Sequence, residues 1–159
     1  MNFRTGFGFD VHQLVKGREF WLGGIKIPYF KGGLGHSDAD VLIHVICDAL
    51  LGAANLGDIG KHFPDNSAEF KDIDSKILLQ NVMILVRDKG YEIGNIDTTV
   101  CLQSPKLSQY IIDMKIVLSK CMNIDVDCIS IKATTTEKLG YVGREEGVSA
   151  YANVLINKH

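Results

Sequence analysis

The sequence F-R-T-G-F-G-F-D-V-H at residues 3–12 decides the fold. In an extended chain its side chains alternate between two faces. One face carries Phe3, Thr5, Phe7, Phe9 and Val11. The other face carries Arg4, Gly6, Gly8, Asp10 and His12. This alternation predicts a half-buried β-strand with a carboxylate and an imidazole on one face, and with open space beside them where the glycines have no side chain.

Helices and further strands alternate along the rest of the chain. Residues 38–54 predict a helix, because apolar residues recur there with helical spacing at Leu42, Val45, Ile46, Ala49, Leu50 and Ala53. Ser37 and Asp40 at its start resemble a capping box. The remaining ranges predict a hairpin over 19–29 turning at Gly23 and Gly24, a long loop over 55–73, helices over 74–89 and 107–122, and strands over 95–103, 128–136 and 147–157. This order predicts an α+β fold, a mixed β-sheet with helices packed on one face.

Length and composition fit a single domain over residues 1–159. The chain carries 17 Lys and Arg against 19 Asp and Glu, and the resulting net charge of −2 does not favour binding to nucleic acid or to a membrane surface. A hydrophobic content of 46% excludes a disordered segment. No apolar run approaches the roughly 18 residues of a membrane span, and the N-terminus lacks the apolar region of a signal peptide. We therefore expect a cytoplasmic protein with free thiols at Cys47, Cys101, Cys121 and Cys128.

A possible metal site joins the first strand to the first helix. Asp10 and His12 share one strand face, and His44 lies on a polar stripe with Asp40 and Asp48, each four residues apart along the helix. Two histidines and one carboxylate suit Zn²⁺ with one coordination position left for a substrate. The alternative for His44 is a hydrogen-bonded histidine of the core. Asp48 would either orient His44 from behind or remain solvated at the helix edge.

Two other segments could bind phosphate. His36, in G-H-S-D at 35–38, precedes the first helix, whose free amide groups favour an anion, but it could equally be a solvated loop histidine. In K-A-T-T-T-E-K at 132–138, hydroxyls lie between lysines and Glu137 could hold a harder cation such as Mg²⁺, although a strand alone explains the β-branched run. Arg144 could bind a phosphate through two hydrogen bonds. The sequence contains neither G-x-S-x-G nor a P-loop, so nothing supports a serine hydrolase or a P-loop protein.

Several motifs together resemble the 2-C-methyl-D-erythritol 2,4-cyclodiphosphate synthase family of the non-mevalonate isoprenoid pathway. They are G-F-D-V-H at 8–12, H-S-D-A-D-V-L-I-H at 36–44, L-G-D-I-G-K-H-F-P-D at 56–65, S-P-K-L at 104–107, K-A-T-T-T-E-K-L-G at 132–140 and G-R-E-E-G at 143–147. They occur in order over nearly the whole chain. The resemblance implies a phosphorus–oxygen lyase that converts 4-diphosphocytidyl-2-C-methyl-D-erythritol 2-phosphate into 2-C-methyl-D-erythritol 2,4-cyclodiphosphate and CMP, by attack of the 2-phosphate on the β-phosphate.

The resemblance also implies roles for individual residues. Zn²⁺ would be held by Asp10, His12 and His44, and a second divalent cation, Mg²⁺ or Mn²⁺, by Glu137. His36 and Thr135 would stabilise the transition state. The methylerythritol part of the substrate would meet Ser37, Asp58, Ile59, Gly60, Phe63, Pro64, Asp65, Asn66 and Ser67. The remaining substrate contacts would come from Leu102, Gln103, Ser104, Pro105, Lys106, Leu107, Ser108, Thr134, Thr136, Tyr141 and Arg144.

The family resemblance implies an assembly as well. Its members are homotrimers in which each active site lies between neighbouring subunits and the sheets line a central cavity. We therefore expect a trimer with a small-molecule cytidine diphosphate substrate. An isoprenoid diphosphate in the central cavity, near Phe9, Arg144 and Glu146, is a further hypothesis from the resemblance.

Two other functions fit part of the pattern. Two histidines and a carboxylate also bind iron in mononuclear oxygenases. Those ligands usually lie on the strands of a β-barrel, however, whereas His44 lies on a predicted helix. A non-catalytic trimeric binding module could keep the same fold, but it would not need the whole set of Asp10, His12, His44, Thr135 and Glu137.

Overall fold

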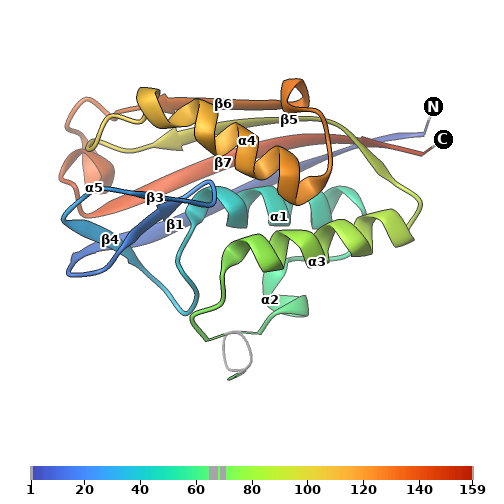
Figure 1. Ribbon diagram of the computed structural model, residues 1–159, viewed down its shortest axis with the longest axis horizontal. Coiled ribbons are helices and arrows are strands. Elements are labelled where there is room, and N and C mark those ends of the chain that lie inside the picture. Colours follow the sequence, from blue (N-terminus) through green and yellow to red (C-terminus); the bar gives the residue numbers. More distant parts are fainter. Residues whose placement is uncertain (1, 65–67, 69–70, 159) are drawn as a thin grey trace.

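The chain forms a β-sheet covered by helices (Figure 1), and the computed structural model describes residues 2–64, 68 and 71–158. Within these residues the strands are β1 (Phe3–Lys16), β2 (Phe20–Leu22), β3 (Ile25–Ile27), β4 (Lys31–Leu34), β5 (Glu92–Cys101), β6 (Ile129–Thr134) and β7 (Gly147–Asn157). The helices are α1 (Val41–Ala53), α2 (Ile59–His62), α3 (Ser75–Asp88), α4 (Ile111–Met122) and α5 (Gly140–Gly143), with 3₁₀ turns η2 (Ser108–Tyr110) and η3 (Val126–Cys128).

The main sheet has the strand order β4-β1-β7-β5-β6 in the described part of the chain. Strands β1 and β7 pair antiparallel from Phe3 opposite Asn157 to Gln13 opposite Gly147. This pairing places the two ends of the chain side by side (Figure 1). Strands β5 and β6 are parallel because helix α4 crosses between them, whereas β1 pairs antiparallel with β4 and β5 pairs antiparallel with β7. The predicted mixed sheet is therefore confirmed.

The helices cover one face of this sheet, as predicted. Helix α1 lies against β1 and β7, α3 lies beside α1, and α4 packs against β6 and β3 (Figure 1). On the opposite face, five large side chains are between 37% and 61% exposed, namely Phe3, Phe7, Phe9, Val11 and Tyr151. Within one chain, the face of β1 that carries Gly6, Gly8 and Asp10 is therefore turned toward the helices, and its aromatic face is left uncovered.

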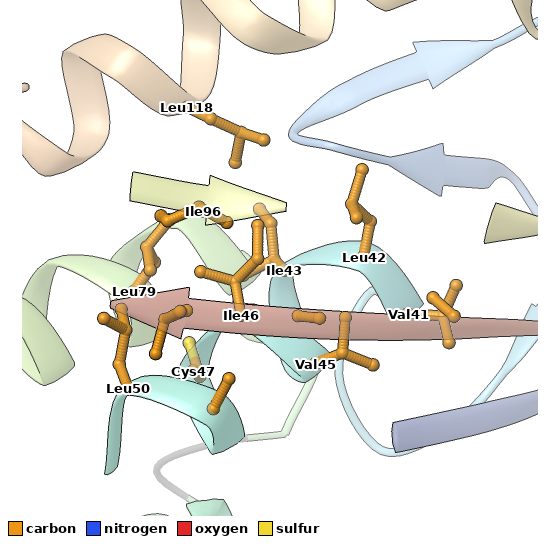
Figure 2. Packing of buried hydrophobic residues seen from close by; sticks show 14 of the residues in the cluster. Val41, Leu42, Ile43, Val45, Ile46, Cys47, Leu50, Leu79, Ile96 and Leu118 are labelled. Atoms are coloured by element: carbon orange, nitrogen blue, oxygen red, sulfur yellow. The ribbon is translucent and has the colours of Figure 1, made fainter. Parts of the chain in front are cut away.

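The hydrophobic core lies between the sheet and helices α1, α3 and α4. Figure 2 shows side chains of α1 packed with Ile96 of β5, Leu79 of α3 and Leu118 of α4. All six residues of the predicted apolar stripe of α1 are buried, and so are residues on its other sides, namely Val41, Ile43, Cys47 and Leu51. Because α1 is buried on most of its sides, with His44, Asp48 and Gly52 as the exceptions, it fixes the positions of its neighbours.

Glycines at the centre of β1 let α1 approach the strand closely. A Cβ atom on Gly8 would clash with the carbonyl oxygen of Val45, and one on Gly6 would clash with that of Ala49. The predicted open space beside Asp10 is therefore wrong, because the backbone of α1 fills it. The same close approach carries His44 toward the strand.

The buried carboxylate of Asp40 joins the start of α1 to the β2–β3 hairpin. It is the N-cap of α1 and accepts a hydrogen bond from the amide of Ile43 at 3.0 Å. It also accepts from the amides of Gly23 and Gly24, at 2.9 and 2.7 Å, where the predicted hairpin turn is confirmed. The predicted capping box is wrong, because the hydroxyl of Ser37 instead accepts from the amide of Ala39.

Most other predicted elements are present with shifted ends. The predicted helix over 74–89 is α3, and the helix over 107–122 begins with η2 and continues as α4. The loop over 55–73 contains the short helix α2, anchored by its N-cap Asp58. The four cysteines are free, as expected. Among the described residues, no helix has the length and apolar character needed to cross a membrane.

Replacing Gly8 with alanine should lower the free energy of unfolding by about 1–3 kcal/mol, because the new Cβ would force β1 and α1 apart. Gly52→Ala is the matched control, since it lies on the exposed side of α1 and its added Cβ meets nothing within 4 Å. We expect that control to raise the free energy of unfolding by up to about 1 kcal/mol. Urea denaturation at fixed protein concentration measures both, and equal stability of the two variants would contradict the close contact.

Candidate active site

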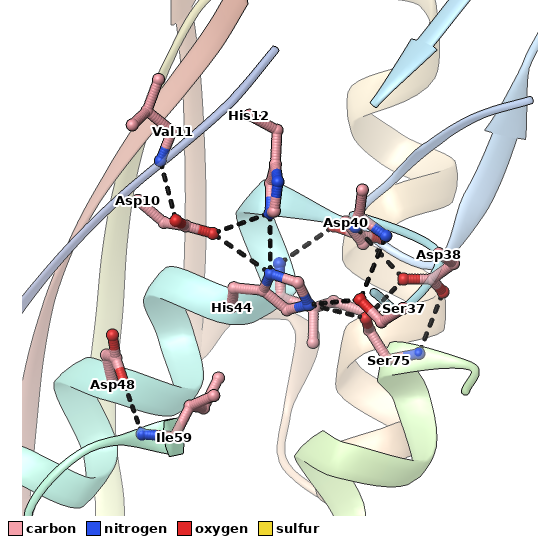
Figure 3. Close-up of polar contacts among 12 residues, drawn as sticks. Asp10, Val11, His12, Ser37, Asp38, Asp40, His44, Asp48, Ile59 and Ser75 are labelled. Carbon is pink, nitrogen blue, oxygen red and sulfur yellow. Dashed lines mark hydrogen bonds and ion pairs between the residues drawn. The ribbon is translucent and has the colours of Figure 1, made fainter. Parts of the chain in front are cut away.

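Two elements bring together a carboxylate and two imidazoles. Asp10 and His12 lie on the buried face of β1, and His44 projects from α1 toward them (Figure 3). The Oδ2 atom of Asp10 is 3.0 Å from Nε2 of His12 and 3.1 Å from Nδ1 of His44. The two imidazole nitrogens are 3.0 Å apart. The predicted convergence of these side chains is therefore present in the structure.

The donor atoms of this triad fit a divalent metal ion. In tetrahedral zinc sites, bonds of about 2.0–2.2 Å place neighbouring ligand atoms about 3.3 Å apart. The separations of 3.0–3.1 Å in the triad need to open only slightly to reach that value. The side chains are 27%, 16% and 13% exposed for Asp10, His12 and His44, which leaves an approach from one side. The triad could therefore hold Zn²⁺ with one coordination position open.

His12 is oriented by a main-chain carbonyl. Its Nδ1 atom is 3.1 Å from the carbonyl oxygen of Leu34 in β4. Because a carbonyl oxygen only accepts, Nδ1 carries the hydrogen and donates it. The lone pair of Nε2 then faces Asp10 and His44, as a metal ligand requires.

The electrostatics of the triad favour an ionised carboxylate. Burial alone would raise the pKa of the Asp10 carboxyl, but the neighbouring imidazoles of His12 and His44 outweigh it and hold that pKa well below its usual range. Burial alone would lower the pKa of His12, but the neighbouring carboxylate of Asp10 raises it above the ordinary value. Asp10 is thus ready to bind a cation.

The partners behind His44 differ from the predicted one. Its Nε2 atom is 3.0 Å from the hydroxyl of Ser75 and 3.2 Å from that of Ser37. Asp48, the predicted partner, instead accepts from the amide of Ile59 at 2.8 Å and thereby fixes the start of α2 (Figure 3). The expectation that Asp48 orients His44 is wrong; Asp48 is half-buried and faces the cavity, and burial raises the pKa of its carboxyl. Ser75 was missed because it lies 31 residues from His44 in sequence.

The triad opens into a cavity of about 310 Å³. Its walls come from β1, the 34–37 segment, α1, α2 and the start of α3: Asp10, His12, Leu34, Gly35, His36, Ser37, His44, Asp48, Ile59, Phe63, Ile73 and Leu78. The structure thus brings the predicted substrate residues His36, Ser37, Ile59 and Phe63 to the triad. Asp58, Gly60 and Pro64 do not line this cavity, and Asp65, Asn66 and Ser67 lie outside the described residues. At the start of α1, the carboxylate of Asp40 occupies the place predicted for a phosphate.

A second cavity, of about 220 Å³, lies where β5 and β6 end and α4 begins. Its walls are Leu102, Gln103, Pro105, Lys106, Leu107, Ser108, Ile111, Ala133, Thr134 and Thr135. The structure therefore assembles most of the predicted nucleotide segment into one pocket together with Thr135. The carboxylate of Glu137 is 3.5 Å from the Thr135 hydroxyl. Within the described part of the chain, the two cavities share no lining residue.

Some predicted phosphate ligands are paired with carboxylates or carbonyls. Lys132 forms an ion pair with Asp97 of β5 at 2.7 Å. Arg144 donates two hydrogen bonds of 3.1 Å to Glu146 and lies exposed after α5, next to the partly exposed Tyr141. The hydroxyl of Thr136 donates to the carbonyl of Leu139 at 2.6 Å. These residues lie outside both cavities of the single chain.

The fold and site together define an α+β protein with a two-histidine, one-carboxylate triad that could hold a metal ion, at the base of a cavity. The model of the YgbB family matches residues 3–157, so the chain belongs to the YgbB family. A relative from Bacteroides fragilis named 2-C-methyl-D-erythritol 2,4-cyclodiphosphate synthase is 66% identical over 158 residues, 99% of each chain. A relative of the same name from Porphyromonas gingivalis is 60% identical, over 97% of this chain and 95% of that one. The resemblance inferred from the sequence motifs is confirmed.

Solved structures agree with this assignment. The bifunctional IspDF from Campylobacter jejuni superposes with a TM-score of 0.95 at 43% identity, over 99% of this chain and 42% of that one. The Plasmodium falciparum IspF CDP complex has a TM-score of 0.87 at 36% identity, over 99% of this chain and 98% of that one. A 2C-methyl-D-erythritol-2,4-cyclodiphosphate synthase in a bound form with CDP has a TM-score of 0.89 at 36% identity, over 97% of this chain and all of that one.

His44→Ala should abolish stoichiometric zinc binding, because it removes one of the three donors. His62→Ala is the matched control and should keep the zinc, since the imidazole of His62 donates to the carbonyl of Leu56 and is not one of the triad. The measurement is elemental analysis after the chains are stripped with a chelator, reloaded with zinc and desalted. Full zinc occupancy in His44→Ala would contradict the assignment of the triad.

Proposed function

We propose that the chain converts 4-diphosphocytidyl-2-C-methyl-D-erythritol 2-phosphate into 2-C-methyl-D-erythritol 2,4-cyclodiphosphate and CMP. The observation that carries this proposal is the Asp10–His12–His44 triad at the base of a cavity, in a chain 66% identical over its length to a relative named for this product. An oxygen of the 2-phosphate attacks the β-phosphorus and forms the new P–O bond. The bond between the β-phosphorus and the bridging oxygen breaks, and CMP leaves with that oxygen and its electron pair.

The triad would hold Zn²⁺ at the first cavity. When bound, the ion supplies a Lewis acid that polarises a phosphate oxygen. His36 and Ser37 line the same cavity and would hold the phosphate and the erythritol hydroxyls against it. Asp58, Ile59 and Gly60, with the segment from Phe63 to Ser67, would enclose the methylerythritol part. Fixing both ends of one molecule could supply much of the roughly 7–11 kcal/mol that orientation can remove from a barrier.

The second cavity would bind the cytidine nucleotide. Its walls include most of the segment from Leu102 to Ser108, together with Thr134 and Thr135. Two structural neighbours that are named as CDP complexes support a cytidine nucleotide as ligand. The hydroxyl of Thr135 would donate to the diphosphate as charge develops, and Glu137 would hold a second divalent cation, Mg²⁺ or Mn²⁺.

The active site would lie between neighbouring subunits of a homotrimer. One substrate must contact both cavities, yet within the described residues these cavities share no wall. The uncovered aromatic face of β1 and β7 supplies an apolar surface for the interior of such an assembly. The first cavity of one subunit would then meet the second cavity of its neighbour, with Tyr141 and Arg144 near the junction.

An iron oxygenase fits the geometry less well. Its ligands usually lie on β-barrel strands, whereas His44 lies on helix α1 beside an open sheet. That function would also leave the second cavity and its threonine hydroxyls unused. A chelator that abolishes CMP release, with activity restored by zinc, separates the two functions.

Thr135→Ala should slow CMP release by about 100-fold while zinc content stays unchanged, because the variant loses a hydroxyl at the diphosphate and no zinc ligand. Ser130→Ala is the control, since Ser130 is an exposed hydroxyl residue on β6 that lines neither cavity. Steady-state CMP release and elemental analysis measure the two quantities. A wild-type rate in Thr135→Ala would show that this hydroxyl has no part in the reaction.

Mixed trimers test whether the site is shared. Co-expressed His44→Ala and Thr135→Ala chains, purified through two different tags, should regain about one third of the sites of the wild-type trimer, because each mixed ring has one junction with both cavities intact. Trimers of either variant alone are the controls. Mixed trimers that are no more active than these controls would place both cavities of a site in the same subunit.

A further inference from the structure

We propose that Ser75 and Asp38 are positioning residues that fix the tautomer of His44, so that its Nδ1 lone pair points at the metal position. This inference deepens the proposed function and rests on its metal site. The feature that carries it is a continuous set of hydrogen bonds from Asp38 through Ser75 to His44 (Figure 3). It links the segment before α1, the first residue of α3 and the first turn of α1.

The direction of each hydrogen bond in this set follows from chemistry. The hydroxyl of Ser75 lies 2.5 Å from Oδ1 of Asp38, and a carboxylate can only accept, so the hydroxyl hydrogen points to Asp38. The amide of Ser75 donates to Oδ2 of the same carboxylate at 2.9 Å. The Ser75 oxygen, 3.0 Å from Nε2 of His44, is then left to accept. Nε2 must therefore carry the imidazole hydrogen, and Nδ1 keeps its lone pair.

The second hydroxyl near His44, that of Ser37, does not change the direction of the hydrogen bond between Nε2 and Ser75. Ser37 Oγ lies farther from Nε2, at 3.2 Å, and already accepts from the amide of Ala39. Because Ser75 accepts the hydrogen bond from Nε2, the hydroxyl hydrogen of Ser37 remains available to donate into the cavity that Ser37 lines. Ser37 can thus donate to a substrate phosphate, while Ser75 acts on the imidazole.

The hydroxyl of Ser75 is not needed as a helix cap, whereas Asp38 also accepts from the main-chain amides of Ser75 and Asp40, at 2.9 and 3.1 Å. The N-cap of α3 is Asp74, whose side chain accepts from the amide of Lys76, so the hydroxyl of Ser75 is not the cap. The N-cap of α1 is Asp40. Ser75 is nevertheless fully buried, and its hydroxyl has no contact with solvent to satisfy it. Its position and its partners are those of a residue that orients a metal ligand.

The arrangement matches that of the other imidazole. His12 donates from Nδ1 to the carbonyl of Leu34 and directs Nε2 inward. His44 donates from Nε2 to Ser75 and directs Nδ1 inward. Both lone pairs thus point at one position, and each histidine uses a different nitrogen.

Zinc affinity tests the role of Ser75 without any substrate. Competition with a chromophoric chelator should show that Ser75→Ala binds zinc about 10-fold to 100-fold more weakly than the unchanged chain. Ser119→Ala is the matched control, because it also removes a helical hydroxyl that donates a hydrogen bond, in this case within the region of α4 to the carbonyl of Ile124 at 2.7 Å. The control should keep the wild-type affinity. Wild-type affinity in Ser75→Ala would overturn the proposal.

A second variant and a spectroscopic measurement test the proposal even if Ser75→Ala fails to fold. Asp38→Asn changes the far end of the set and should weaken zinc binding in the same direction but less, because its amide oxygen can still accept from Ser75. Nitrogen-15 NMR of the zinc-loaded unchanged chain should show His44 with its hydrogen on Nε2. A hydrogen on Nδ1 would overturn the proposal whatever the affinities.

An unchanged chain that binds no zinc would overturn both this inference and the proposed metal site, whereas zinc binding without CMP release would count against the proposed reaction alone.

Discussion

The close approach of α1 to β1 is the contact on which the site depends. Gly6 and Gly8 leave no side chain between the two backbones, so the carbonyl groups of the helix lie against the strand. This distance sets how far His44 reaches, and it ends within 3.1 Å of Asp10. A bulkier residue in the strand would move the helix outward and the imidazole with it. A packing requirement in the core thus determines the geometry of the polar site.

Polar contacts around this packing hold the ligands in orientation. Asp40 fixes the start of α1 to the hairpin, and Leu34 and Ser75 each accept from one imidazole of the triad. Within the part of the chain that the structure describes, no buried side-chain nitrogen or oxygen lacks a partner. The low pKa of Asp10 follows from the same arrangement, because its two imidazole neighbours outweigh its burial. These contacts therefore fix the orientation of the side chains of the triad.

The correct predictions from the sequence concern features that a local residue pattern determines. Alternation placed Asp10 and His12 on one face of β1, and helical spacing placed His44 on α1. The failures concern neighbours distant in sequence. The space beside the glycines of β1 is filled by the α1 backbone, and Asp48 binds an amide of α2. Ser75 carries no motif and meets His44 only because α3 packs on α1. The order of strands likewise depends on pairings that periodicity does not encode.

The central claim is that a carboxylate from a strand and imidazoles from a strand and a helix bind one divalent ion. X-ray absorption at the zinc edge of the loaded chain tests it most directly. The account predicts imidazole nitrogen and carboxylate or water oxygen at about 2.0–2.2 Å, with the multiple-scattering pattern of two imidazole rings. Sulfur ligands at about 2.3 Å, or a shell without imidazole scattering, would contradict it.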